Sequence, residues 1–137
     1  PNKKYILTTT LLFVIISSWR KIMSAANHDL VIDQGSTFTI DLVVKENSVI
    51  KNLTGYSARA AMKTSKSATG TAATFSCTIP TPTDGTVKME LIATTTAALT
   101  AGQYFYDLEI HTADNAIVKR LIEGTVNINA GITNGAA

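Results

Sequence analysis

Hydrophobic and polar residues alternate with a period of two along most of the chain after Asp29, and this pattern predicts β-strands. The clearest run spans residues 38–44, where Phe, Ile, Leu and Val alternate with Thr, Asp and Val. The last run, residues 117–128, is interrupted by Gly124, where we expect a β-bulge. The alternation predicts largely buried side chains at Phe38, Ile40, Leu42, Tyr56, Met62, Val87, Met89, Leu91, Tyr104, Tyr106 and Leu108.

Turn signals separate these runs about every ten residues. A small, polar stretch at residues 63–72 predicts a flexible surface loop, and residues 93–99 favour one helical turn. Several short strands at this spacing indicate an all-β fold, which we predict to be an immunoglobulin-like antiparallel β-sandwich. The turn signals are Glu46-Asn47, Leu53-Thr54-Gly55, Asp84-Gly85 and Ala113-Asp114-Asn115.

The most specific local pattern is Leu99-x-x-Gly102-x-Tyr104 at the start of an alternating run. It matches a tyrosine corner, in which a tyrosine hydroxyl bonds to the backbone a few residues upstream. The glycine allows the tight turn, and the leucine is expected to pack under the ring. We expect structural roles for Leu99, Gly102 and Tyr104, and for Gly55, Tyr56 and Gly85 in the turns.

Residues 1–22 differ from the rest, because two lysines precede a short apolar stretch that Arg20 and Lys21 follow. Three interpretations stay open for this segment. It is translated upstream sequence with Met23 as the true start, a signal peptide or anchor, or a structural arm. In each case the segment is expected to lie outside a sandwich domain at residues 23–130, which a flexible tail at 131–137 follows.

Composition restricts the classes of function. The chain has 137 residues, 45% of them hydrophobic and 16% charged, with a net charge of +2. This length fits one domain with its own core. The small charge and the absence of a basic, aromatic stripe argue against a nucleic-acid partner. The single cysteine, Cys77, excludes a disulfide within the chain and fits a reducing compartment.

No catalytic constellation stands out in the sequence. Asp107 and Glu109 share a strand face but are typical of a solvated surface, and His28 and His111 are isolated. One cysteine and two distant histidines do not make a zinc site. The sequon at Asn52-Leu53-Thr54 is expected to be a chance match. We therefore expect no enzyme activity and no cofactor.

Four segments resemble small virion proteins of tailed phages, especially cyanophages. The shared motifs include Gln34-Gly35, a Leu-Thr-Gly-Tyr turn at 53–56, and Ala58-Arg59. Later motifs are a Gly-x-Val strand at 85–91, Gly-x-Tyr-x-Tyr-Asp-Leu at 102–108, and Arg-Leu-x-x-Gly-x-Val at 120–126. The resemblance covers residues 29–133. It implies the fold and a virion setting, and it assigns no site residues.

The resemblance implies a non-enzymatic structural or adaptor protein in the tail, baseplate, neck or fibre of a phage assembled in the host cytoplasm. Its partners would be other virion proteins or further copies of itself, which Val49-Ile50 or Thr125–Ile128 would contact as edge strands. Contact with a membrane is expected only if residues 1–22 are an anchor. The alternative is an exported adhesion or glycan-binding module at the cell surface, with residues 1–22 as signal peptide.

Overall fold

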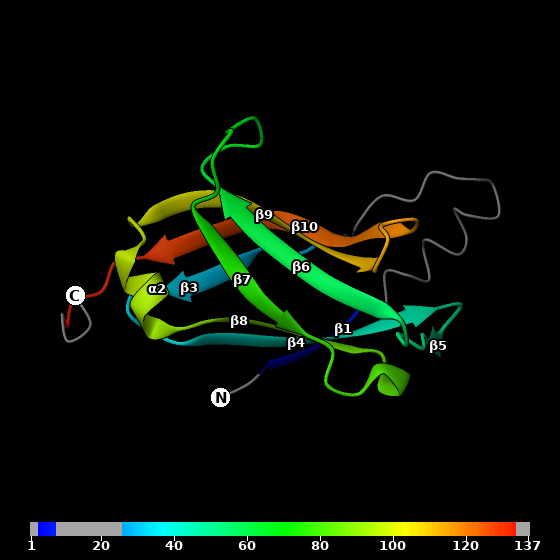
Figure 1. Cartoon of the computed structure of the whole chain (residues 1–137). Helices are drawn as coiled ribbons and strands as arrows, with labels where there is room; N and C mark the ends of the chain where they lie inside the picture. The colour runs from blue at the N-terminus through cyan, green and yellow to red at the C-terminus, as the bar shows by residue number, and fades with distance from the viewer. Residues whose placement is uncertain (1–2, 8–25, 134–137) are drawn as a thin grey trace.

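The computed structural model describes the backbone of residues 3–7 and all atoms of residues 26–133 (Figure 1). Ten strands and two short helical segments form the described part of the chain. The strands are β1 (Lys3–Leu7), β2 (Ala26–Asn27), β3 (Leu30–Asp33), β4 (Phe38–Glu46), β5 (Val49–Ile50), β6 (Tyr56–Lys63), β7 (Ala73–Thr78), β8 (Thr86–Leu91), β9 (Gly102–Thr112) and β10 (Val118–Asn129). A 3-10 turn, η1, spans Pro82–Asp84, and α2 spans Ala93–Ala98.

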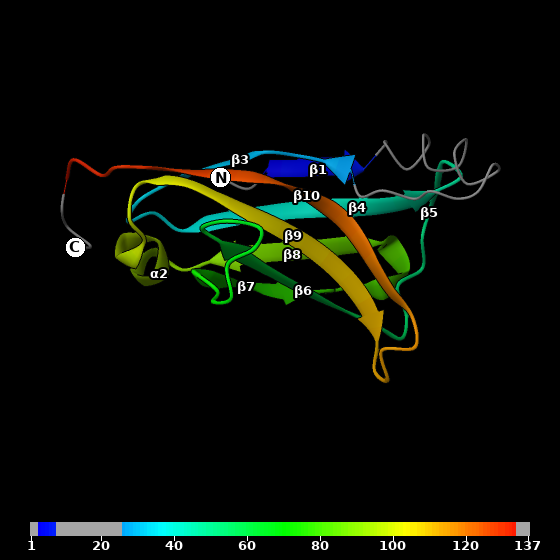
Figure 2. The same cartoon turned by 90° about the horizontal axis from the view of Figure 1, so that it is seen from above.

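The strands form one curled sheet in the order β1-β4-β8-β7-β6-β9-β10-β2, with β3 also on β10 and β5 on β4. Strand β7 turns the sheet from one layer into the other, since Ala73–Phe75 pair with β6 and Ser76–Thr78 pair with β8. Figure 2 shows the resulting curl, with β4 and β8 facing β9 and β10 across the interior. The all-β prediction is confirmed.

The strictly antiparallel arrangement predicted from the sequence is wrong at both ends of the strand order. Strand β1 runs parallel to β4, and both β2 and β3 run parallel to β10. Alternation fixes which side chains face inward, but it does not report strand direction, so the sequence pattern could not reveal these pairs.

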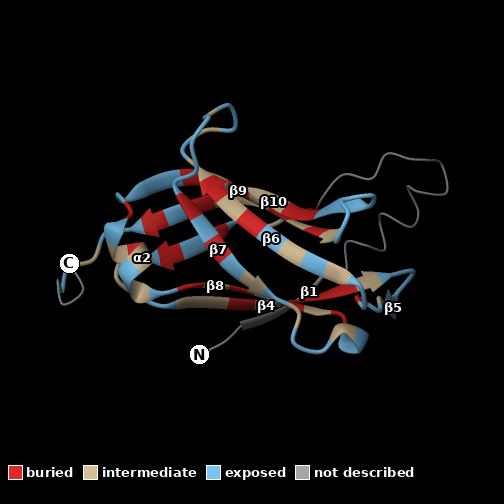
Figure 3. Ribbon diagram, viewed as in Figure 1, coloured by how far each residue is buried: buried red, intermediate tan, exposed pale blue. Residues whose placement is uncertain are grey.

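The core lies between the two layers of the curl, and Figure 3 shows buried residues alternating with exposed ones along the strands. Phe75 links the layers, because its ring lies 6.2 Å from that of Phe38 and 6.1 Å from that of Tyr106. Of the residues predicted to be buried, Phe38 and Tyr56 are only half-buried and pack against the core. The others are buried as expected: Ile40, Leu42, Met62, Val87, Met89, Leu91, Tyr104, Tyr106 and Leu108.

The predicted bulge at Gly124 is misplaced. The register of β10 against β9 shifts between Arg120 and Ile122, and Gly124 pairs regularly with Tyr106. The glycine is needed for a different reason. A Cβ at this position would lie 2.5 Å from the carbonyl oxygen of His28, so the β2–β3 connection can cross here only over a residue without a side chain.

Two expectations about the periphery also change. Residues 3–7 belong to the sheet instead of lying outside the domain, while residues 8–22 fall outside the described residues. Thr125–Ile128 is not an edge strand, because β10 pairs with β9 on one side and with β3 on the other. No helix within residues 26–133 is long and apolar enough to cross a membrane.

Candidate functional site

The hydrogen bond expected of a tyrosine corner is present. The Tyr104 hydroxyl donates to the Thr100 carbonyl oxygen at 2.7 Å. Gly102 has φ +144°, which a residue with a side chain rarely adopts, and Leu99 is buried in the same core cluster as Tyr104. These residues hold the start of β9 against the segment that connects α2 to β9, so they contribute to the stability of the fold.

The predicted turn residues also hold loops together. Gly55 and Gly85 have φ +88° and +70°, in the left-handed region that favours glycine. A Cβ on Gly85 would lie 2.8 Å from Ile50 Cγ2 and 2.9 Å from the Lys51 carbonyl oxygen. The Lys51 ammonium lies 5.6 Å from the Tyr56 ring centroid, which pins the segment after β5 onto β6.

Gln34 carries a role that the sequence pattern did not reveal. Its Nε2 donates to the Leu99 carbonyl oxygen at 2.8 Å, and its Oε1 accepts from the Gly131 backbone N–H at 3.0 Å. Its backbone N–H donates to Asn129. Nearby, the fully buried Thr96 hydroxyl lies 2.7 Å from the Ser36 carbonyl oxygen and 3.1 Å from the Gly35 N–H. This cluster joins the β3–β4 turn, α2 and the end of β10.

Tyr106 makes the second tyrosine contact of β9. Its hydroxyl donates to the His28 carbonyl oxygen at 2.5 Å. Burial raises the pKa of this phenol, and the neighbouring Asp29 carboxylate raises it further. Asp29 in turn accepts from the Thr125 N–H at 2.9 Å. The contact fixes the β2–β3 connection onto β9 and β10.

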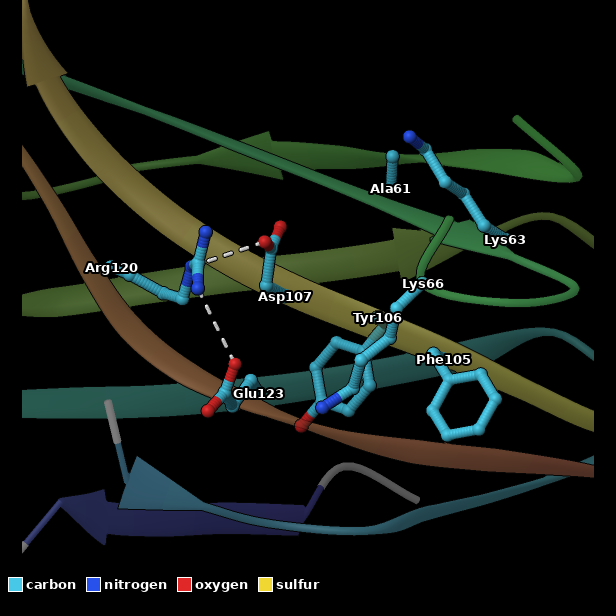
Figure 4. Close-up of a pocket in the computed structure, with 8 residues that line it drawn as sticks. All are labelled: Ala61, Lys63, Lys66, Phe105, Tyr106, Asp107, Arg120 and Glu123. Carbon is cyan, nitrogen blue, oxygen red and sulfur yellow. Dashed lines mark hydrogen bonds and ion pairs between the residues drawn. The ribbon is translucent and has the colours of Figure 1, made fainter. Parts of the chain in front are cut away.

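A hollow of about 390 Å³ lies on the outer face of β6, β9 and β10 (Figure 4). Ala61 is among the residues that line it, and Lys66 lies 5.9 Å from the Phe105 ring centroid at one end. At the other end Arg120 forms ion pairs with Asp107 at 3.2 Å and Glu123 at 3.5 Å. The hollow is open and carries charges of both signs.

The carboxylates singled out in the sequence are partnered by arginines. Asp107 pairs with Arg120, and Glu109 pairs with Arg59 at 2.6 Å. Partial burial raises the pKa of Asp107, with the carboxylates of Glu109 and Glu123 adding to the effect and Arg120 opposing it. The structure thus places this pair on a surface ladder of ion pairs across β6, β9 and β10.

The remaining candidate groups lie apart from one another. Burial raises the pKa of the Cys77 thiol to about 12, so the thiol is protonated at neutral pH. His111 Nδ1 lies 3.0 Å from the Thr112 carbonyl oxygen at the end of β9. The Asn52 side chain accepts from both the N–H and the hydroxyl of Thr54 in a local turn. Within residues 26–133, no three His, Cys, Asp or Glu side chains gather as metal ligands would.

Several large aliphatic side chains are exposed. Val31 on β3 is 61% exposed, and Val49 and Ile50 on β5 are 64% and 47% exposed. The other exposed ones are Ile92, Ile117, Val118 and Ile132, all in or beside connections between elements. Among the described residues, these are the large aliphatic side chains that are left exposed to solvent.

No protein-family model and no curated protein sequence matches the chain. Among solved structures, the N-terminal domain of phage TP901-1 ORF48 is similar, with a TM-score of 0.55 and 11% identity over 93% of this chain and 96% of that one. The cysteine protease inhibitor EhICP2 from Entamoeba histolytica has a TM-score of 0.46 and 13% identity over 93% and 95%. The chain therefore has a fold similar to that of a phage protein domain.

Proposed function

We propose that the chain is a non-enzymatic structural or adaptor protein of a tailed-phage virion, acting through protein–protein interfaces. Two independent likenesses support the phage setting. One is the resemblance of its sequence motifs to small virion proteins of phages, cyanophages in particular. The other is the similarity of its fold to the N-terminal domain of phage TP901-1 ORF48. A place in the tail, baseplate, neck or fibre follows from the first likeness.

The observation that carries an interface function is the exposure of aliphatic side chains on short strands. Val49 and Ile50 form the two-residue strand β5, whose single neighbour among the described strands is the end of β4. Val31 lies on β3, which pairs with β10 on one side. Branched aliphatic residues on such strands favour pairing and packing with another chain, and monomeric proteins usually shield them with charge.

The state of the reactive groups supports an absence of catalysis. The raised pKa of Cys77 keeps its thiol in the non-nucleophilic form, and Asp107 and Glu109 are each held by an arginine. We expect that replacing Asp107, Glu109, His28 or His111 singly with alanine abolishes no activity. A substrate that the parent chain turns over and one of these variants does not would contradict the proposal.

Incorporation into particles tests the proposed function. The phage that encodes the chain is purified, and mass spectrometry is used to detect the chain in intact particles. A double variant, Val49→Lys with Ile50→Lys, is expected to reduce incorporation strongly, since lysine on an edge strand opposes pairing. Ser76→Lys, at an exposed position on β7, serves as the control and is expected to incorporate normally.

Two outcomes would contradict the proposal. One is a chain that is absent from purified particles and binds a glycan array, which would favour the exported adhesion module. The other is equal incorporation of the β5 variant and the Ser76 control, which would remove β5 from the interface. The N-terminal mass of the mature chain separates the alternatives further, because cleavage after Ala26 fits export and would remove β1.

A further inference from the structure

The edge of β4 is occupied by β1 in an arrangement that a second copy of the chain could reproduce. The register pairs Lys3 with Ile40 and runs in parallel to Leu7 beside Val44. Strand β1 stands at the end of the strand order, and among the described strands its one neighbour in the sheet is β4. Its place in the sheet therefore depends on one ladder, which any strand of the same sequence could form.

The edge of β4 that pairs with β1 carries two outward-facing residues of note. Ile40, Leu42 and Val44 face the core, so Asp41 and Val43 face outward. Val43 is nevertheless only 6% exposed, although it lies outside the main core cluster. Its register partner on β1 is Ile6. The low exposure of Val43 shows that β4 is covered on its outward-facing side at this position.

Charge complementarity points to the same occupant. Asp41 Oδ1 is buried and has no hydrogen-bond partner. The register places Lys4 of β1 beside Asp41 on one side and Lys88 of β8 on the other. An acidic position between two lysine positions favours a strand that begins with two lysines, as residues 3–7 do.

The chain is long enough to reach another copy. Residues 8–25 connect β1 to β2, and fully extended they span roughly 60 Å at about 3.3 Å per residue. A domain of this size has a radius of gyration of only about 14 Å. Because the pairing is parallel, no tight turn holds β1 against β4 of its own chain. The connection therefore permits exchange without any change in the ladder.

We propose that β4 is a strand-acceptor site between copies, at which residues 3–7 of one chain pair with Ile40–Val44 of another in the assembled protein. The proposal deepens the proposed function and rests on it in naming a second copy as the partner. The strand exchange is tested with the isolated chain, whereas the proposed function is tested with phage particles, so the two can fail separately.

Disulfide trapping between single-cysteine chains tests the exchange. In a Cys77→Ser background, one full-length chain carries Ile6→Cys, and a second, distinguished by a mass tag, carries Val43→Cys. These positions are register partners, and neighbouring strands bring Cα atoms within disulfide range. After mild oxidation at high protein concentration, we expect most of the product to be the mixed dimer. This bond cannot form within one chain.

A double variant, Ile6→Cys with Val43→Cys, is oxidised in parallel, with Thr39→Cys/Glu90→Cys on β4 and β8 as the matched control. The control is expected to close within single chains. If the Ile6/Val43 double variant also closes only within single chains and the mixture gives no mixed dimer, β1 stays on its own β4 and the exchange is refuted. The exchange would also be refuted if neither the mixture nor the Ile6/Val43 double variant forms a disulfide while the control does, because β1 would then not lie on β4.

Discussion

Replacing Tyr104 with phenylalanine isolates one hydrogen bond of the fold. Tyr104 is 6% exposed, and its hydroxyl donates to Thr100 at 2.7 Å. A neutral hydrogen bond of this kind contributes about 1 kcal/mol net to stability. The cost stays near that value because Thr100 is exposed, so its carbonyl regains water when the hydroxyl is lost. We expect Tyr104→Phe to lower the free energy of unfolding by about 1 kcal/mol.

Urea denaturation, followed by far-ultraviolet circular dichroism, measures the change in the free energy of unfolding. The slope m is expected to stay constant. Thermal unfolding should shift down by about 3–6 °C for a domain of this size. Tyr56→Phe is the matched control, because within residues 26–133 the Tyr56 hydroxyl forms no hydrogen bond, and its expected change is below about 0.5 kcal/mol. Equal midpoints for the two variants would refute a stabilising role for the corner.

Three further predictions follow from buried contacts. Gly124→Ala should destabilise the fold by about 2 kcal/mol or more, because its Cβ meets the His28 carbonyl, whereas Gly70→Ala, with nothing within 4 Å, should be neutral in the same denaturation assay. Gln34→Ala should cost about 1–3 kcal/mol and raise amide exchange at Gly131. At pH 8, Cys77 should react with a disulfide reagent far more slowly in the native state than in urea, since its thiolate fraction is roughly 1,000-fold lower. Equal labelling rates in the two states would contradict the raised pKa.

The Cys77 shift also has a consequence for stability. The folded protein holds the thiol proton more tightly than the unfolded chain, whose reference pKa is 9.0. Stability linked to this group is therefore complete below about pH 9 and falls as the pH rises toward 12. A Cys77→Ser variant should lack this part of the alkaline decline.

Alternation identified the longer strands from β4 onward and nine buried residues of the core. It did not identify β1 or β2. The helical turn predicted at residues 93–99 from helix propensity is α2, Ala93–Ala98. What it missed depends on contacts between segments far apart in the chain. Gln34 joins residues 65 and 97 positions away, and the close approach at Gly124 comes from His28. Neither of these long-range contacts produces a periodic pattern in the local sequence, so the sequence indicates only a bulge at Gly124.

Several residues of the motifs that resemble phage virion proteins join different segments of this fold. Gln34 ties the β3–β4 turn to α2 and β10, and Gly102 with Tyr104 forms the corner before β9. Gly55 turns the chain into β6. The interfaces that we propose lie elsewhere, at the sheet edges where β1 and β5 meet β4 and where Val49 and Ile50 are exposed. The residues that carry the resemblance therefore account for the scaffold, whereas the proposed interfaces depend on exposed residues outside these motifs.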